Sequence, residues 1–347
     1  MTRILRTVLA LALAFAVAGC VESGRGDTGA QSAAACPFEP DPGITATARL
    51  GFQAIPNADL YVKDRGLLEA CLPNATITWS RFASGADVVQ AFGAGSIDIA
   101  TLGSSPATKA VSAPLNLPVR VLWIHDVIGE SESLVAKAPI TEVAGLRGKR
   151  VATPFGSTAH YSLLAALDEA RLTGQVELVN LQPEAIPGAW TGNQIDAAWV
   201  WAPTLPKLIE AGGTAIASSA DTAAAGSATF DVAAATTAFL EQHSDFAAVW
   251  AKVQNYAVGR LRDNPQEAAV SVGAQLGIDP QQALPQLAGY TYPTAAEQAG
   301  PRYLGGDFAG NLRNTAQFLL NQGGVEAVGS EQDYRAALYP DAARSAQ

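Results

Sequence analysis

The sequence predicts an α/β fold with two lobes and a helical C-terminal segment. From residue 46, short apolar runs alternate with amphipathic segments of helix length. After Phe230 this alternation gives way to alanine-rich segments with helical spacing. The N-terminal leader and the spacer after it, up to residue 43, leave roughly 300 residues to fold, enough for one large domain or two lobes. Strand and helix alternation is typical of βαβ units, so we expect mostly parallel sheets covered on both faces.

The first residues predict an export signal. Arg3 and Arg6 precede an apolar run, Val8 to Val17, that is too short to span a bilayer. The run ends in "VAGC", which resembles the lipobox of bacterial lipoproteins. We therefore expect a signal peptide over 1–19 and lipidation at Cys20, on the outer face of the cytoplasmic membrane or in the periplasm. Plain secretion with an incidental cysteine is the alternative.

The segment 20–43 is rich in Gly, Ser, Ala, Asp and Pro and has no apolar periodicity, so it predicts a flexible linker between lipid and fold. Lipidation of Cys20 leaves Cys36 and Cys71, and a pair of cysteines in an exported protein is a disulfide candidate. Two cysteines do not make a usual structural metal site.

The apolar runs predict the order of strands and helices. We expect strands at 47–52, 75–80, 97–102, 119–124, 149–155, 176–181, 197–201 and 214–219. Helices are expected between them at 58–70, 86–94, 105–113, 158–171 and 203–212, and then at 237–263, 265–276, 280–289 and 309–322. This order fits a chain that crosses between two lobes and ends on the first. Composition alone leaves the crossing open.

Charge excludes one class of partner. The net charge is -10, which argues against a nucleic-acid surface. There is no GxxxxGK[ST] loop, and no GxGxxG follows a strand, so no nucleotide cofactor is expected.

Three predicted strands run directly into helices at small polar turns. These turns are Gly103-Ser104-Ser105, Gly156-Ser157-Thr158 and Trp201-Ala202-Pro203. Ligands of open α/β sheets bind at such turns, where helix starts offer free N–H groups. The serines predict a neutral cradle for an anion, although each serine could instead only cap its helix.

Ser157 and His160 invite a catalytic reading, which the spacing does not support. A serine three residues before a histidine at a helix start lacks the GxSxG elbow, and three histidines in the chain make a metal cluster improbable. We expect His160 to be a pocket donor or a helix-start residue and the protein not to be an enzyme.

Aromatic and acidic side chains complete the candidates. Trp199 and Trp201 share one face of a strand, and Trp201 stands at its carboxyl end; Trp190 lines the cleft or packs under it. Glu132 and Asp231 lie where the chain would cross between lobes. A carboxylate beside an anion cradle suggests a zwitterionic ligand; solvated charges on a surface strand are the alternative.

Several motifs together resemble the taurine-binding proteins of ABC importers, within the wider group that binds aliphatic sulfonates, nitrate and thiamine precursors. They are "WSRFASGADVVQAFGAGSIDIATLGSSP", "LRGKRVATPFGSTAHYSLLAAL", "VELVNLQPEAI", "GAWTGNQIDAAWVWAPTL" and "ATFDV". They cover most of residues 46–235 in the family's order. Beyond them "AQFLLNQGGV" is similar more loosely.

The resemblance implies a type II periplasmic-binding fold, with lobe 1 at 44–133 and 232–347 and lobe 2 at 134–231. It implies that Asp231 takes the taurine ammonium, helped by Glu132. The other implied ligand-binding residues are Gly103, Ser104, Ser105, Ser157, Thr158, His160 and Tyr161 on the sulfonate side, with Gln53, Trp190 and Trp201 as walls.

The implied function is capture of taurine, or a close small sulfonate, by a monomer that delivers it to an ABC permease without a cofactor. Ala83 stands where the family often has Asp, and no tryptophan shortly precedes "TFDV", so one wall of the pocket is more open than usual. Binding of alkanesulfonate, nitrate, bicarbonate or a thiamine pyrimidine shares the fold and stays an alternative. A hydrolase-like enzyme and a purely structural lipoprotein are more distant ones.

Overall fold

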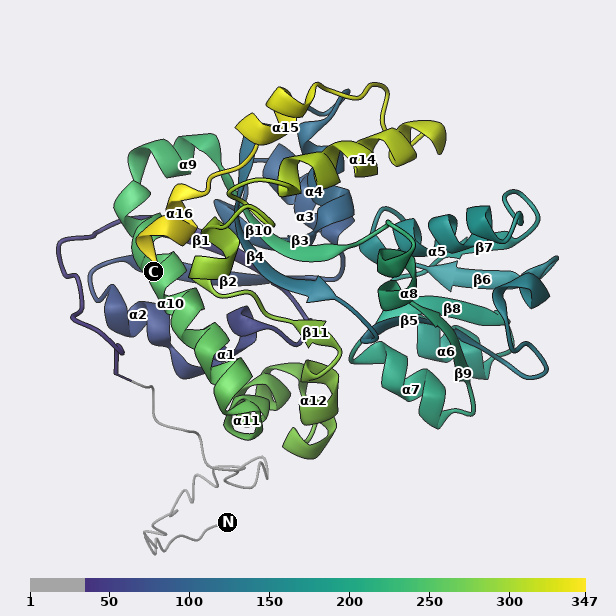
Figure 1. Ribbon diagram of the computed structural model, residues 1–347. Helices are drawn as coiled ribbons and strands as arrows, with labels where there is room; N and C mark the ends of the chain where they lie inside the picture. Colours follow the sequence, from purple (N-terminus) through teal and green to yellow (C-terminus); the bar gives the residue numbers. More distant parts are fainter. Residues whose placement is uncertain (1–34) are drawn as a thin grey trace, which may run out of the picture. The chain divides into compact units, whose positions relative to one another are not determined.

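The computed structural model describes residues 35–347 and contains two β-sheets, each with its own helices (Figure 1). The first sheet has the order β11-β4-β10-β3-β1-β2, with β1 (Thr47–Gln53), β2 (Thr76–Phe82), β3 (Ile99–Gly103), β4 (Val119–Ile128), β10 (Phe230–Thr236) and β11 (Tyr290–Thr291). The second has the order β7-β6-β8-β5-β9, with β5 (Glu132–Ala136), β6 (Arg150–Thr153), β7 (Glu177–Asn180), β8 (Ala197–Trp201) and β9 (Thr214–Ser218). Each sheet with its helices is called a lobe below.

The helices divide between the lobes in the same way. The first lobe carries α1 (Ala58–Arg65), α2 (Leu67–Cys71), α3 (Gly85–Gly93), α4 (Ser104–Val111), α9 (Thr237–Gln242), α10 (Ser244–Asp263), α11 (Pro265–Leu276), α12 (Pro280–Leu287), α13 (Ala295–Ala299), α14 (Phe308–Asn321), α15 (Glu331–Ala336) and α16 (Asp341–Ser345). The second carries the 3-10 helix η1 (Val143–Leu146), α5 (Thr158–Glu169), α6 (Ile186–Thr191), α7 (Thr204–Glu210) and α8 (Ser219–Ala224). The α/β fold with a helical C-terminal segment on the first lobe is confirmed.

Strand direction corrects one prediction. Four pairings are parallel, β1–β2, β1–β3, β6–β7 and β6–β8, so the sheets are mixed rather than mostly parallel. In the first sheet β10 runs antiparallel between β3 and β4, and in the second β5 runs antiparallel between β8 and β9. These two strands follow the crossings of the chain, which reverse its direction.

The crossings lie close to the two candidate acids. The chain leaves the first sheet at Ile128 and enters the second at Glu132, and it returns to the first sheet at Phe230. The sheets therefore place Glu132 in the second lobe and Asp231 in the first, each one or two residues away from the expected lobe boundaries. Their side chains are buried, with 1% and 3% relative exposure, so neither is a solvated charge on a surface strand.

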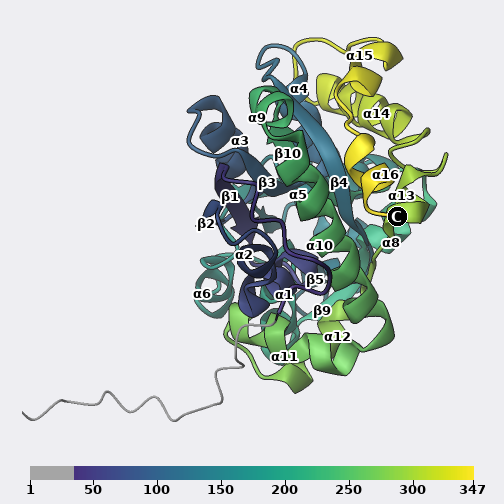
Figure 2. The same ribbon diagram turned by 90° about the vertical axis from the view of Figure 1, so that its left-hand side faces the viewer.

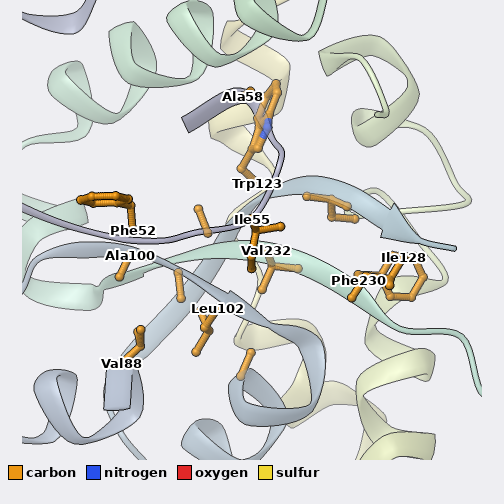
Figure 3. Packing of buried hydrophobic residues seen from close by; sticks show 14 of the residues in the cluster. Phe52, Ile55, Ala58, Val88, Ala100, Leu102, Trp123, Ile128, Phe230 and Val232 are labelled. Atoms are coloured by element: carbon orange, nitrogen blue, oxygen red, sulfur yellow. The ribbon is translucent and has the colours of Figure 1, made fainter. Parts of the chain in front are cut away.

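The first sheet is buried on both faces. Figure 3 shows Val88 and Leu102 on one side of its strands and Trp123 with Ala58 on the other. Trp123 meets Trp250 of α10 edge to face, with ring centroids 6.3 Å apart. Figure 2 shows α1, α2 and α10 together over this face. Cover on both faces explains why every residue of β3 and all but the last residue of β10 are buried.

Two predicted helices are each broken into two. Gly66 adopts the left-handed conformation (φ 57°), which ends α1 and starts α2 within the predicted 58–70 helix. His243 interrupts the predicted 237–263 helix between α9 and α10. The other helix predictions agree with the structure to within about four residues.

Cys36 and Cys71 form a disulfide, with a Cα–Cα distance of 4.8 Å. Cys71 is the last residue of α2, and its carbonyl accepts the N–H of Asp41 at 2.8 Å. The bond thus fastens the segment before β1 to the first lobe.

We expect the double variant Cys36→Ser/Cys71→Ser to lower the free energy of unfolding by about 3–4 kcal/mol, because the bond closes a loop with a sequence separation of 35 residues. Denaturant unfolding of the variant and the oxidised protein measures this. Equal midpoints would contradict the expectation.

Candidate functional site

The candidate site is a tight cavity between the two lobes, with a volume of about 10 Å³. A ligand larger than water can enter this cavity only when the lobes separate and the lining side chains move aside. The cavity is lined by Gln53, Ile55, Gly85, Gly103, Pro106, Ile128, Glu132, Ser157, Thr158, Trp201, Asp231 and Tyr290.

Strand topology gathers these residues at one edge of each sheet. Gln53 ends β1 and Gly103 ends β3, while Asp231 lies near the start of β10. Because β10 is antiparallel to β3, its first residues meet the last ones of β3, and Asp231 pairs with Gly103. In the second sheet Trp201 ends β8 and pairs with Glu132, which starts β5. The crossing strands thereby place one carboxyl from each lobe at the carboxyl ends of the parallel strands.

Two helix starts also face this edge. Helix α4 begins at Ser104, directly after Gly103, and α5 begins at Thr158, directly after Ser157. The first N–H groups of a helix have no acceptor within it and carry the positive end of its dipole. With Ser157 and Thr158 lining the cavity, these helix starts offer neutral donors to an anion.

Glu132 is held by hydroxyl groups rather than by a cation. Thr158 Oγ1 and Ser219 Oγ each donate to its carboxylate at 2.6 Å. Burial raises its pKa to about 7, although these hydrogen bonds act in the opposite direction. Glu132 is thus a buried acid at the cavity wall that titrates near neutrality.

Asp231 is buried in the opposite wall. Burial raises its pKa to about 7, with a further contribution from the negative charge of Glu132. Among the residues described, no Lys, Arg or His side chain lines the cavity. The two acids therefore favour a ligand that brings a positive charge.

The lobes are in close contact beside the cavity. A Cβ added at Gly103 would lie 2.5 Å from Thr158 Cγ2, so only glycine allows this approach of β3 to α5. Arg81 on β2 forms a salt bridge of 2.9 Å with Glu184 of the second lobe. The structure is accordingly a closed arrangement of the two lobes.

Five of the expected ligand-binding residues do not line the cavity. Ser104 Oγ accepts the N–H of Phe230 at 3.2 Å and so fixes the start of β10. Ser105 and His160 line a separate groove of about 670 Å³ between α3, α4, α5 and α14. The ring of Tyr161 packs edge to face on Phe318 of α14, with centroids 4.8 Å apart.

His160 and Trp190 lie elsewhere than the cavity lining. His160 Nδ1 accepts the N–H of Gly156 at 3.2 Å and its ring stacks on Phe155; burial lowers its pKa to about 4, so it stays neutral. Two positions beyond Thr158 on α5, it points away from the side that Thr158 presents to the cavity. Trp190 lies under the ammonium of Lys137, 5.1 Å from its ring, on α6 away from the cavity.

The sequence interpretation missed Ile55, Gly85, Pro106, Ile128 and Tyr290. Tyr290 comes from β11, a two-residue strand within the predicted helical tail that pairs with Ile128. The aromatic alternation of Tyr290 and Tyr292 after Gly289 was the available signal. Within residues 35–347 no cluster of His, Cys, Asp and Glu could hold a metal ion, and no helix is long and apolar enough to cross a membrane.

The sequence is similar to known solute-binding proteins. Residues 80–268 match the family model described as "NMT1/THI5 like". The chain is 40% identical over 264 residues to the taurine-binding periplasmic protein of Escherichia coli (strain K12), which covers 74% of this chain and 81% of that protein.

Solved structures share the fold. The alkanesulfonate-binding protein SsuA from Xanthomonas axonopodis pv. citri, bound to MOPS, superposes with a TM-score of 0.69 at 21% identity, over 87% of this chain and 99% of that one. The desulfurization enzyme DSZB superposes with a TM-score of 0.62 at 15% identity, over 87% and 98%. The predicted periplasmic-binding fold is confirmed. The family model and the taurine-binding relative show that the chain belongs to the NMT1/THI5-like family.

Proposed function

We propose that this solute-binding protein captures taurine, or a close small aminosulfonate, between its lobes and delivers it to the permease of an ABC importer. One observation carries the choice of ligand. Glu132 and Asp231 line the cavity, while none of the described residues lining it is Lys, Arg or His. A buried carboxylate without a cation is costly, and an ammonium group on the ligand removes this cost.

The sulfonate of such a ligand suits the helix starts that border the same cavity. A sulfonate stays ionised at all relevant pH values, so it needs hydrogen-bond donors and no proton. The starts of α4 and α5 supply N–H donors beside Gly103 and Thr158. The ligand therefore lies with its ammonium at Asp231 and Glu132 and its sulfonate at the helix starts.

The other ligands of this fold group fit the walls less well. Nitrate, bicarbonate and simple alkanesulfonates bring a negative charge and no cation, so binding them would leave Asp231 and Glu132 without a positively charged partner. Repulsion between buried like charges opposes such ligands.

The walls favour binding without chemistry. The hydroxyl of Ser157 donates to the Pro154 carbonyl, and that of Thr158 donates to Glu132. No Cys, His or Lys is among the described residues lining the cavity, and the only carboxylate bonded to one of these hydroxyls, that of Glu132, also accepts a hydrogen bond from Ser219. We therefore assign the protein a binding role, although the fold also carries the enzyme DSZB.

Closure of the lobes links capture to delivery. The lobes move about the crossings at 129–131 and 225–229, and the ligand stabilises the closed state by contacting both lobes. The permease then recognises the closed monomer.

Anchoring is proposed through Cys20, which lies outside the described residues. Lipidation there would hold the exported protein at the membrane surface by way of the 20–43 linker. We expect Cys20→Ser to release the protein into the soluble fraction when the native precursor is expressed. A variant that still sedimented with membranes would contradict lipidation.

Isothermal titration calorimetry of residues 21–347 with taurine, ethanesulfonate, nitrate and glycine betaine tests the function. We expect taurine to bind most tightly, because it alone brings both an ammonium with free N–H donors and a sulfonate. Absence of binding to either sulfonate would refute the proposal.

A further inference from the structure

A third carboxyl lies behind the cavity. Asp126 of β4 is paired with Asp231 across the sheet and is fully buried, at 0% relative exposure. No Ser, Thr, Asn, Gln, Lys or Arg side chain of the described residues donates to its oxygens, and the backbone N–H of Asp231 is the one donor that acts on it. An ionised carboxylate so placed would be destabilised, because it has lost its hydration and has gained one backbone donor and no cation in return.

The surroundings of Asp126 are acidic throughout. Beside Asp231, the titratable groups that act on the pair are Glu132 from β5, Tyr290 from β11 and Tyr292 just beyond it. None of these groups carries a positive charge. Burial, followed by the charge of Asp231, raises the pKa of Asp126 well above its usual range.

The carboxyl groups of Asp126 and Asp231 can form a hydrogen bond with each other only when one of them is protonated. Two ionised carboxylates are both acceptors, so one of the pair must carry the proton. Asp126 is the more deeply placed of the two, whereas Asp231 lines the cavity where a ligand can meet it. A hydrogen bond from Asp126 favours the ionised form of Asp231, which lowers the pKa of Asp231 against the effect of burial.

We propose that Asp126 is a carboxylic acid that stays protonated at neutral pH and donates its O–H to Asp231, holding Asp231 ionised and oriented toward the ligand's ammonium. Asp126 is thus a positioning residue, and its role rests on the proposed function. It also limits the charge of the Asp126–Asp231 pair to -1. Tyr290, whose hydroxyl has no partner among the described residues, lines the cavity beside this pair and is a second donor or acceptor for the ligand.

Three variants separate this role from a structural one. Asp126→Asn keeps a donor to Asp231 without needing a proton, so we expect taurine affinity within about threefold of the unaltered protein. Asp126→Leu removes the donor and raises the pKa of Asp231. Its affinity should fall about tenfold or more near pH 6.5 and recover above about pH 8.5, because Asp231 must then lose its proton unaided. Gly310→Ala, at a position with no atom within 4 Å of the added methyl, is the matched control.

A loss of taurine affinity in Asp126→Asn as large as in Asp126→Leu would overturn the proposal, since it would mean that the charge of Asp126 itself is needed. Equal pH profiles for Asp126→Leu and the unaltered protein would also overturn it. Infrared difference spectra provide a readout independent of binding. At neutral pH the unaltered protein should show a carboxylic-acid C=O stretch that Asp126→Asn lacks, and its absence would contradict a protonated Asp126 even if no sulfonate binds.

Discussion

Asp231→Asn is expected to weaken taurine binding by about 2–5 kcal/mol, or roughly thirtyfold to several thousandfold. Asp231 is 3% exposed and lines the cavity, so an ammonium bound there, as we propose, is removed from water. Asparagine has nearly the same shape but no charge, and it leaves the ammonium with only Glu132. Calorimetric titration with taurine measures the loss.

Ethanesulfonate provides the internal control, because it has the sulfonate without the ammonium. Asp231→Asn should leave its affinity unchanged or raise it, since the substitution removes a negative charge that repels it. Equal losses for taurine and ethanesulfonate would show that Asp231 supports the pocket as a whole and does not bind the ammonium.

Gly103→Ala is expected to weaken taurine binding about fivefold to a hundredfold, the usual cost of overpacking a buried contact. Gly103 has φ -70° and ψ 158°, which alanine adopts readily, so the first lobe itself should fold normally. The added methyl would meet Thr158 Cγ2 of the other lobe at 2.5 Å and hold the closed lobes apart. Affinity should fall while the midpoint of thermal unfolding without ligand changes little.

A second substitution tests whether Gly103→Ala weakens binding by preventing closure of the lobes. Thr158→Ser removes Cγ2 but keeps the hydroxyl that donates to Glu132. The double variant Gly103→Ala/Thr158→Ser should therefore recover most of the lost affinity. If it recovers none, or if Gly103→Ala binds taurine as the unaltered protein does, the contact between β3 and α5 is not part of the liganded state.

The fold was largely predictable because its periodicities are local. The apolar runs at 47–52, 119–124 and 197–201 became β1, the first part of β4 and β8. Strand β5 was not predicted as a strand, because Glu132 and Ser133 interrupt its apolar pattern. Glu132 is buried because Thr158 and Ser219, which lie elsewhere in the chain, donate hydrogen bonds to it, and a local pattern does not reveal such partners.

Within the site, strand ends were more predictable than helix faces. Gln53, Gly103 and Trp201 line the cavity because topology brings the carboxyl ends of strands together. His160 lies in another groove, since a shift of two positions from Thr158 around α5 turns a side chain to another surface, and Trp190 packs against Lys137. Nothing in the sequence indicated the proposed role of Asp126, because Asp126 lies beside Asp231 only through the pairing of β4 with β10.

The most direct test of the account is a crystal structure of residues 21–347 with taurine. We expect the ligand between the lobes, with its nitrogen within hydrogen-bond distance of Asp231 and its sulfonate oxygens at the N–H groups that start α4 and α5. Taurine bound in the opposite orientation, or in the groove beside His160 and Phe155, would contradict it.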